Sequence, residues 1–482
     1  MSELEGRAVR GGLWVGVEKV FTRGLRIASY AVIARILGND LIGLFGLAVI
    51  TLTLTNRFSE LGIDTALVAR EDAIDDVLPT AFSLQLARGL LLAAVLFAVA
   101  PLVATFFSDP RVTGLVRVIA IVPVLDALHN PGLVSLDREL DFRRLAGLNV
   151  AEEATYAAVG VGVAVATGSV LAPVAGIVAK SVVRAVGSFL IVDLRAVPAF
   201  DLAEAKRLIG YGKWLTGTSI LGWLTREGDD ALVGALLGTG AVGFYRTAYQ
   251  FGRAPQTEIT GVINRVAFPS YSNVQRDTHA LRVGYRRTLQ LTGALAFPAA
   301  VGAAVVAPVF VPVVLGDGWS EAVPVMQVLA LTTVFHTVGA SAAPLFQALD
   351  RPDLHTKIQF GVLVVLGVTI VPLIQAYGIV GAGLSVVLSV ALTAPIRAYF
   401  AARLLEGRLL EQVAPLAPPA AATVAMAAVV VPLAGMVPVS VVGLVALIAA
   451  GVLAYGVATL ALHAAGVGVV GLARELLGAA RG

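Results

Sequence analysis

Residues 7–48, RAVRGGLWVGVEKVFTRGLRIASYAVIARILGNDLIGLFGLA, return 200 positions later as residues 207–248, RLIGYGKWLTGTSILGWLTREGDDALVGALLGTGAVGFYRTA. The two stretches align without a gap and share nine identical residues. One identity pairs Trp14 with Trp214, which is informative because the chain has only four tryptophans. The alignment indicates an internal repeat, and the repeat reveals how the chain is organised.

The correspondence continues further along the chain at slightly different offsets. Leu136-Asp137-Arg138 matches Leu349-Asp350-Arg351 at an offset of 213, and Gly168 matches Gly378 at an offset of 210. Each match lies between two consecutive apolar stretches. Counted from the start of each copy, these stretches have the same numbers in both copies. The repeated unit therefore contains six apolar stretches.

Apolar stretches of membrane-spanning length fill most of the chain. Hydrophobic residues make up 57% of the sequence and charged residues 14%, a composition that a soluble protein of 482 residues could not bury. Fourteen stretches are long enough to cross a hydrocarbon core of about 30 Å. The predicted spans are 12–37, 41–61, 80–106, 113–135, 147–167, 170–193, 210–237, 241–267, 288–313, 321–348, 354–375, 378–402, 413–433 and 440–462.

The distribution of Lys and Arg predicts the orientation. Of the 35 such residues, 18 fall in the termini and the even-numbered connections, whereas the odd-numbered connections carry only Arg111. Positive residues favour the cytoplasmic side, so we expect a multi-pass protein of a prokaryotic plasma membrane with both termini in the cytoplasm. The basic balance of +3 reflects these loops and does not suggest nucleic-acid binding.

The predicted fold class is therefore all-α, with fourteen transmembrane helices. A unit with an even number of spans keeps its topology when it is repeated, so the two copies should be related by an axis along the membrane normal. We expect an N-lobe over 1–200, a C-lobe over 201–405, and two extra helices over 406–482 that end in a short amphipathic tail on the cytoplasmic surface. Two parallel bundles around a shared cleft are typical of alternating-access transporters.

Several motifs, in this order, resemble a known family. They are Leu37-Gly38 with Gly43-Leu44-Phe45, Leu237-Gly238 with Gly243-Phe244-Tyr245, Leu136-Asp137-Arg138-Glu139-Leu140-Asp141-Phe142-Arg143-Arg144, and Phe268-Pro269-Ser270. Together with the 6+6+2 arrangement of helices, the chain looks like the Wzx-like polysaccharide transporters of the MOP superfamily. The MurJ lipid II flippases and the MATE exporters are cousins of this branch.

The resemblance implies a function and a site. It implies a MOP flippase fold in which helices 1, 2, 7 and 8 line a central cavity and helices 13 and 14 offer a groove for a lipid tail. It implies a flippase, not an enzyme, that moves a polyprenyl-diphosphate-linked oligosaccharide, of undecaprenyl or dolichol type, from the cytoplasmic to the outer leaflet. It also implies a monomer, with a glycan polymerase or glycosyltransferases as partners, and no cofactor.

Charged residues at membrane depth are costly unless they face a cavity or a partner, so they are the candidate site residues. Span 1 carries a polar stripe at helical spacing, and span 8 carries a longer one. A site rich in arginine suits a multi-oxygen anion, because guanidinium groups bind phosphate oxygens in bidentate fashion. The predicted substrate-binding residues are Lys19, Arg23, Arg26, Arg57, Arg226, Arg246, Gln250 and Arg253. The alternative is that Arg57 and Arg253 pair with Glu60, Glu258 or the span 7 carboxylates as structural links.

A second group of polar residues is a candidate for ion coupling. Asp126 and His129 are i, i+3 neighbours in span 4, and they either take up a coupling proton or form a buried structural pair. In span 7, Glu227, Asp229 and Asp230 either bind Na⁺ or H⁺ or neutralise nearby arginines. An H⁺ gradient, a Na⁺ gradient or the membrane potential would drive the cycle. Lys180 and Arg184 in span 6 are expected to snorkel to the cytoplasmic face.

Three other functions remain as alternatives. Acidic residues at 71–76 and at Asp137 and Asp141 are a pattern that holds Mg²⁺ on a diphosphate in membrane prenyltransferases, but Asp350 echoes Asp137 and an Arg follows each, which fits loop salt bridges better. A MATE-like exporter of organic cations would favour carboxylates and aromatics over arginine. A MurJ-like lipid II flippase is the third alternative. No Walker A loop or cysteine occurs, so ATP hydrolysis and thiolate metal sites are not expected.

Overall fold

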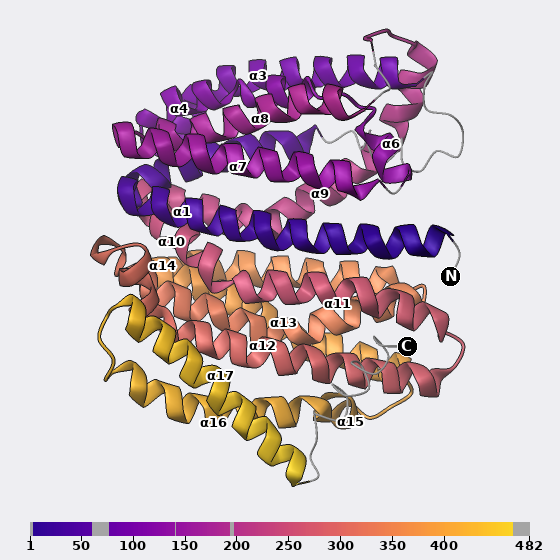
Figure 1. The fold of residues 1–482 in the computed structure, drawn as a ribbon, viewed down its shortest axis with the longest axis vertical. Coiled ribbons are helices and arrows are strands. Elements are labelled where there is room, and N and C mark those ends of the chain that lie inside the picture. The colour runs from indigo at the N-terminus through magenta and orange to yellow at the C-terminus, as the bar shows by residue number, and fades with distance from the viewer. Residues whose placement is uncertain (1–2, 60–76, 140, 193–196, 466–482) are drawn as a thin grey trace. The chain divides into compact units, whose positions relative to one another are not determined.

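The computed structural model describes residues 3–59, 77–139, 141–192 and 197–465, and every long element in them is a helix (Figure 1). The α-helices are α1 (Glu3–Phe58), α3 (Leu78–Phe106), α4 (Arg111–Ile119), α5 (Val122–Ala127), α6 (Leu133–Arg138), α7 (Phe142–Thr167), α8 (Leu171–Ile191), α9 (Leu202–Leu237), α10 (Thr239–Gly252), α11 (Ala254–Asn273), α12 (Thr278–Val314), α13 (Ala322–Ala348), α14 (Pro352–Leu404), α15 (Leu409–Val413), α16 (Ala417–Ala434) and α17 (Val441–Ala464). Two short 3₁₀ turns are η1 (Asp317–Trp319) and η2 (Ala414–Leu416). The all-α fold class is confirmed.

Glycines with positive φ mark the corresponding turns of the two repeats. Gly38, inside α1, has φ of 76°, and its counterpart Gly238 has φ of 84° between α9 and α10. Gly168, at the end of α7, has φ of 59°, and its counterpart Gly378, inside α14, has φ of 58°. Glycine adopts this region without the steric cost that a Cβ brings. The repeat seen in the sequence is therefore also present in the backbone.

The described residues of the predicted spans are mostly helical, but the division into helices differs from the predicted one. α1 and α14 each contain two predicted spans, joined at Gly38 and Gly378. Span 4 is divided among α4, α5 and α6, and span 8 between α10 and α11. Among the described residues, eight helical segments are long and apolar enough to cross a membrane. The protein is thus a multi-pass membrane protein, whereas the count of fourteen crossings stays a prediction.

Two compact units, 1–243 and 244–482, make up the chain. In the first unit, α7 packs between α8 and α1, α3 packs on α4 and α5, and α9 packs on α1 and α3. In the second unit, α13 packs against α11, α12 and α14, and the hairpin of α16 and α17 packs on α12 (Figure 1). The lobe boundary at residue 200 stays a prediction, and the amphipathic tail lies outside the described residues beyond 465.

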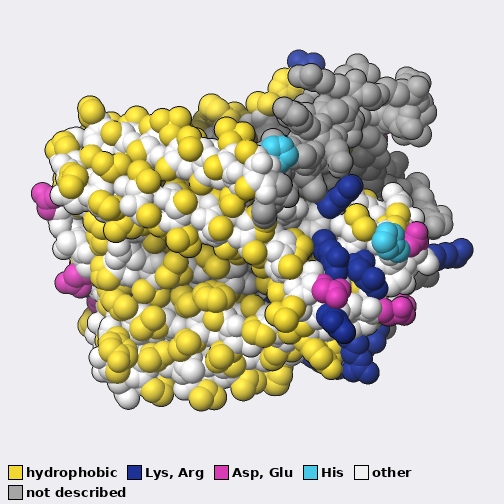
Figure 2. All heavy atoms as spheres, turned by 90° about the horizontal axis from the view of Figure 1, so that it is seen from below, with side chains coloured by type: hydrophobic (Ala, Val, Ile, Leu, Met, Phe, Trp, Pro, Cys, Tyr) yellow, Lys and Arg dark blue, Asp and Glu magenta, His cyan; other side chains and the backbone are white. Residues whose placement is uncertain are grey.

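One face of the second unit separates apolar from basic side chains. Figure 2 shows hydrophobic side chains over most of this face and Lys and Arg gathered at one end. On α17, Val442, Val445, Val452 and Leu453 are exposed apolar side chains. Such side chains suit contact with lipid, because helices satisfy their own backbone hydrogen bonds there. Near the N-terminus of α12, Arg282 Nη2 donates to the Leu405 carbonyl oxygen at 2.6 Å and anchors the chain after α14.

The predicted orientation can be measured with single cysteines, since the chain contains none. Gln275 is exposed between α11 and α12, and Ser320 is exposed between η1 and α13. With cytoplasmic termini, Ser320→Cys reacts with an impermeant maleimide in intact cells, and Gln275→Cys reacts only after permeabilisation. The opposite labelling pattern would show that the orientation is inverted.

Candidate functional site

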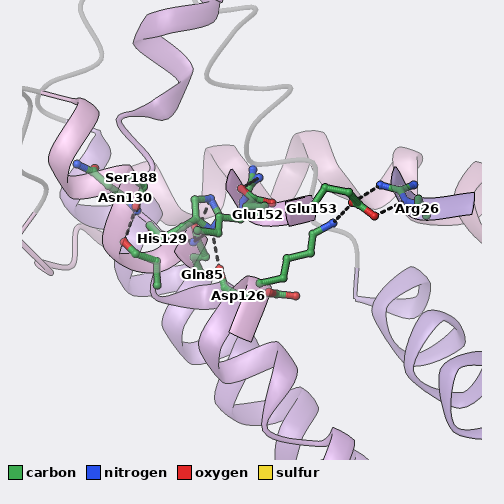
Figure 3. Close-up of polar contacts among 11 residues, drawn as sticks. Arg26, Gln85, Asp126, His129, Asn130, Glu152, Glu153 and Ser188 are labelled. Atoms are coloured by element: carbon green, nitrogen blue, oxygen red, sulfur yellow. Dashed lines mark hydrogen bonds and ion pairs between the residues drawn. The ribbon is translucent and has the colours of Figure 1, made fainter. Parts of the chain in front are cut away.

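The first unit contains a network of ion pairs at the middle of its helices. Arg26 of α1 donates from Nε to Glu153 Oε1 at 3.0 Å and from Nη2 to Glu153 Oε2 at 2.8 Å (Figure 3). Lys180 of α8 lies 3.2 Å from the same Oε2, and Arg184 donates to Glu152 Oε1 at 3.0 Å. Asp126 is close enough to Glu152 to interact with it electrostatically. Three cations, Arg26, Lys180 and Arg184, are thus paired with the two adjacent carboxylates of α7.

The helices explain why these charges meet. α7 begins at its N-cap Asp141, which accepts from the Arg144 backbone N–H, and ends at left-handed Gly168. Lys180 and Arg184 are one turn apart on α8 and therefore share a face. Glu152 and Glu153 are 4% and 3% exposed, so both carboxylates are buried between the helices. Ions in such a place are stable only when they are paired.

Two sequence interpretations change here. The expectation that Lys180 and Arg184 snorkel to the cytoplasmic face is wrong, because buried carboxylates on the neighbouring helix hold both of them. The Glu153 partner of Arg26 was missed, although two adjacent glutamates in an apolar stretch were a visible signal. Arg26 keeps 47% of its side chain exposed, and its Nη1 donates to none of the described residues. Arg26 therefore combines a fixed position with one open edge.

Polar side chains next to this network form hydrogen bonds with backbone groups where a helix is broken. His129 Nδ1 lies 2.5 Å from the Asp126 backbone carbonyl oxygen, and Gln85 Nε2 lies 2.9 Å from the same ring nitrogen (Figure 3). The Asn130 N–H donates to Ser188 Oγ at 2.8 Å, just before the chain turns at Pro131. A broken helix inside a bundle needs such partners for its backbone. These contacts are structural, and the coupling role of Asp126 and His129 stays a prediction.

Helix α9 brings the span 7 carboxylates to α1. Trp223 Nε1 donates to Thr53 Oγ1 at 3.1 Å, and Thr53 Oγ1 donates to Glu227 Oε2 at 2.7 Å. Asp229 and Asp230 are buried. These contacts join predicted spans 2 and 7 within the first unit.

The remaining predicted site residues lie in both units. In the first unit, Arg23 and Arg57 are half-buried on α1, Lys19 is exposed, and the exposed Arg226 folds back over Gly222 of its own helix. In the second unit, Arg246 and Gln250 are half-buried on α10, and Arg253 stands at the break before α11. Each unit thus carries part of the predicted anion site, and convergence of the parts stays a prediction.

Arg253 is held by its own neighbours in the chain. It donates from Nε to Gln256 Oε1 at 3.0 Å, and its guanidinium carbon lies 4.6 Å from the centre of the Tyr249 ring. Pro255 in the first turn of α11 sets the break that presents Arg253. A guanidinium stacked on an aromatic ring has a restricted orientation, which favours bidentate binding of an anion. The acidic stretch 71–76 lies outside the described residues, and no metal-binding cluster occurs among those described.

A close contact joins the turns of the two repeats within the first unit. A Cβ on Gly43 would overlap the Thr239 carbonyl oxygen, and a Cβ on Gly243 would overlap the Asn39 carbonyl oxygen. Only glycines allow the two backbones to cross this closely. The connections after predicted spans 1 and 7 therefore meet within the first unit.

An ion-pair cluster lies beside this crossing. Arg111 Nη2 lies 2.8 Å from Asp109 Oδ2 and its Nη1 lies 2.6 Å from Asp40 Oδ2, while Thr239 Oγ1 donates to Asp109 Oδ2 at 2.7 Å. Arg111 and Asp40 are half exposed, so their pair contributes little. Asp109 is buried, and its hydrogen bond from Arg111 lowers the pKa of the carboxyl to about 2, against burial, which alone would raise it.

The mid-helix network predicts a strong effect of removing one carboxylate. Glu153→Gln leaves Arg26 and Lys180 without their shared anion. The cost should lie below the roughly 3–5 kcal/mol of a fully buried pair, because the Arg26 and Lys180 side chains are 47% and 33% exposed. We expect a lower melting temperature and less protein in the membrane. In the double variant with Arg26→Gln, the loss should be smaller than the sum of the two single losses. Additive losses, or an equal loss in the exposed control Asp317→Asn, would contradict the network.

The Asp109 cluster predicts a defined pH dependence. A carboxylate whose pKa is lowered by folding stabilises the fold above its unfolded pKa of about 3.9 and loses this effect as the pH falls through its folded pKa. The gap in melting temperature between wild type and Asp109→Asn should stay constant from pH 7.5 to 5. It should shrink only below about pH 4. A gap that closes near pH 6 would mean that this carboxylate is not held by Arg111.

Known proteins resemble the chain in sequence and in fold. It is 26% identical to the lipopolysaccharide biosynthesis protein WzxC of Escherichia coli K12 over 73% of this chain and 72% of that protein. It is also 26% identical to the teichuronic acid biosynthesis protein TuaB of Bacillus subtilis, over 66% of each chain. Its structure matches the lipid II flippase MurJ with a TM-score of 0.77 at 13% identity, over 92% of this chain and 97% of that one.

An inward-facing multidrug resistance MATE transporter of the MOP superfamily matches with a TM-score of 0.65 at 14% identity, over 79% of this chain and 94% of that one. The chain therefore shares its fold with these MurJ and MATE transporters, as the sequence led us to expect. The family profile described as "Polysaccharide biosynthesis protein" matches residues 32–324, which is more than half of the chain. The chain belongs to this family of polysaccharide biosynthesis proteins.

Proposed function

We propose that the protein flips a polyprenyl-diphosphate-linked oligosaccharide from the cytoplasmic to the outer leaflet of a prokaryotic plasma membrane by alternating access. The observation that carries this proposal is a transporter fold shared with MurJ in a chain of the polysaccharide biosynthesis family. WzxC and TuaB are named for lipopolysaccharide and teichuronic acid biosynthesis, which fits a glycan cargo. A transporter needs no catalytic residue, and the chain's own groups serve binding and movement.

The arginines supply the binding chemistry for the diphosphate. Arg26 is oriented by Glu153 and offers Nη1, and Arg253 is oriented by Tyr249 and Gln256. Oriented guanidinium groups bind phosphate oxygens at low entropic cost. A MATE-like binding site for organic cations would have no use for either group.

Coupling is the second part of the proposal. A gradient of H⁺ or Na⁺, or the membrane potential, drives the cycle, and Asp126, His129, Glu227, Asp229 and Asp230 are the proposed coupling residues. Burial of Asp229 and Asp230 on α9 supports this choice, because a buried carboxylate gains much from a bound cation.

The site assignment is tested by Arg23→Ala, Arg26→Ala and Arg253→Ala in a strain that lacks its own flippase. Each charge-assisted contact contributes roughly 1.5–3 kcal/mol, so binding of the lipid-linked oligosaccharide should weaken about ten- to a hundredfold. Arg→Lys should restore only part of it, because Lys lacks the planar fork. Glycan export at matched expression and binding to purified protein are the measurements.

Arg117→Ala is the matched control, because this cation stacks over Phe97 at 4.8 Å and belongs to no predicted site. Undiminished export and binding in all three variants would reject the site. Wild-type protein that expels organic cations and does not bind the lipid would instead support the MATE-like alternative.

A further inference from the structure

A groove lies between α7 and α8 in the first unit. The two helices are side by side (Figure 1), and the groove has a volume of about 650 Å³. Ligand pockets typically have roughly 300–1,000 Å³, so the groove is large enough for a ligand. A Cβ on Gly147 of α7 would meet no atom within 4 Å, so this lining residue faces open space. The lack of a side chain at Gly147 therefore helps to keep the groove open.

Apolar side chains form the walls of the groove. Leu148 and Ala151 line it from α7, and Val183 and Leu190 line it from α8. Leu190 is exposed, and α8 is one of the helical segments that are long and apolar enough to cross a membrane. Such walls fit an acyl chain, because contact between apolar surfaces leaves no polar group without a partner.

One end of the groove is basic. Arg143 and Arg144, in the first turn of α7, line the groove there together with Asp141. Arg144 Nη1 donates to the Ile191 carbonyl oxygen at 3.3 Å, and Arg144 Nε lies 3.4 Å from Asp141 Oδ2. These contacts hold the Arg144 guanidinium where α8 ends.

Arg143 has no carboxylate within ion-pair distance among the described residues. Its guanidinium carbon lies 5.7 Å from the centre of the exposed Trp14 ring. Tryptophan is enriched at the depth of the lipid headgroups, which places this end of the groove at the membrane surface. The two arginines and the one carboxylate of Asp141 leave one net positive charge. That charge complements a phosphodiester, whereas a diphosphate carries more negative charge than this end can balance.

We propose that the groove between α7 and α8 binds one anionic phospholipid of the membrane, with its phosphate at Arg143 and Arg144 and an acyl chain along Gly147 and Ala151. With the predicted orientation, the basic end lies at the cytoplasmic headgroups, where anionic lipids gather. The single net charge separates this site from the arginines proposed for the diphosphate cargo. A lipid that binds only the folded protein stabilises it, so the folded state should melt at a higher temperature when the groove is filled.

The test measures the melting temperature of the purified full-length protein in detergent while one lipid is added. Phosphatidylglycerol should raise it with a saturable dependence on concentration. Phosphatidylcholine with the same acyl chains should not, because its headgroup has no net charge, and inorganic phosphate should not, because it has no acyl chain. The double variant Arg143→Gln, Arg144→Gln should bind phosphatidylglycerol about tenfold more weakly or worse, because the charge-assisted contacts to the phosphate are lost. Arg403→Gln removes an exposed cation at the end of α14 and should keep the effect.

Gly147→Leu places a side chain in the groove and keeps both arginines, so it tests the groove apart from general charge attraction. Leucine favours a helix more than glycine does, so this variant should fold. It should weaken the phosphatidylglycerol effect about tenfold. The matched control is Gly162→Leu, because Gly162 is on the same helix and also faces open space, and it should keep the effect.

Two outcomes would overturn the proposal. One is an equal rise in melting temperature with phosphatidylglycerol and phosphatidylcholine, because the groove would then not select an anionic headgroup. The other is a phosphatidylglycerol effect that persists unchanged in Gly147→Leu, because surface charge alone would then hold the lipid.

Discussion

The pairing of charges inside an apolar helix bundle is the constraint on which the first unit depends. Glu153 is buried and touches cations from α1 and α8, so one carboxylate links three helices. None of these ions would be tolerated there alone. The positions of α1, α7 and α8 are therefore set by charge as well as by packing, and a shift of one turn would separate the pairs.

That register follows from the turn between α7 and α8, and it could have been worked out from the sequence. Glu152 stands 16 residues before Gly168 and Arg184 stands 16 residues after it. At about 1.5 Å per residue, two antiparallel helices that meet at Gly168 place both side chains at the same depth. The sequence pattern predicted the two helices and the turn, but it gave Lys180 and Arg184 no carboxylate partner. Counting residues from the turn gives the depth of each side chain, and this count would have predicted the pairing.

Other features were predictable only in part. The repeat indicated the turns at Gly38, Gly168, Gly238 and Gly378, because a turn with positive φ leaves a glycine in both copies. A proline lies close to the break in span 4 and another close to the break in span 8, but hydropathy alone predicts one continuous helix at each place. The crossing of Gly43 with Gly243 depends on contacts between segments far apart in sequence. No local pattern encodes such contacts.

Under the proposed function, the shared carboxylate also explains how the protein stays folded when no substrate is bound. A site arginine needs an anion at all times, and a substrate is present only for part of the cycle. Glu153 supplies that anion to Arg26, while Lys180 gives Glu153 a second cation. When a diphosphate engages Arg26 under the proposed function, Glu153 therefore keeps a partner. An exchange of partners between two cations and two anions costs less than breaking one isolated pair, because no buried charge is left alone at any step.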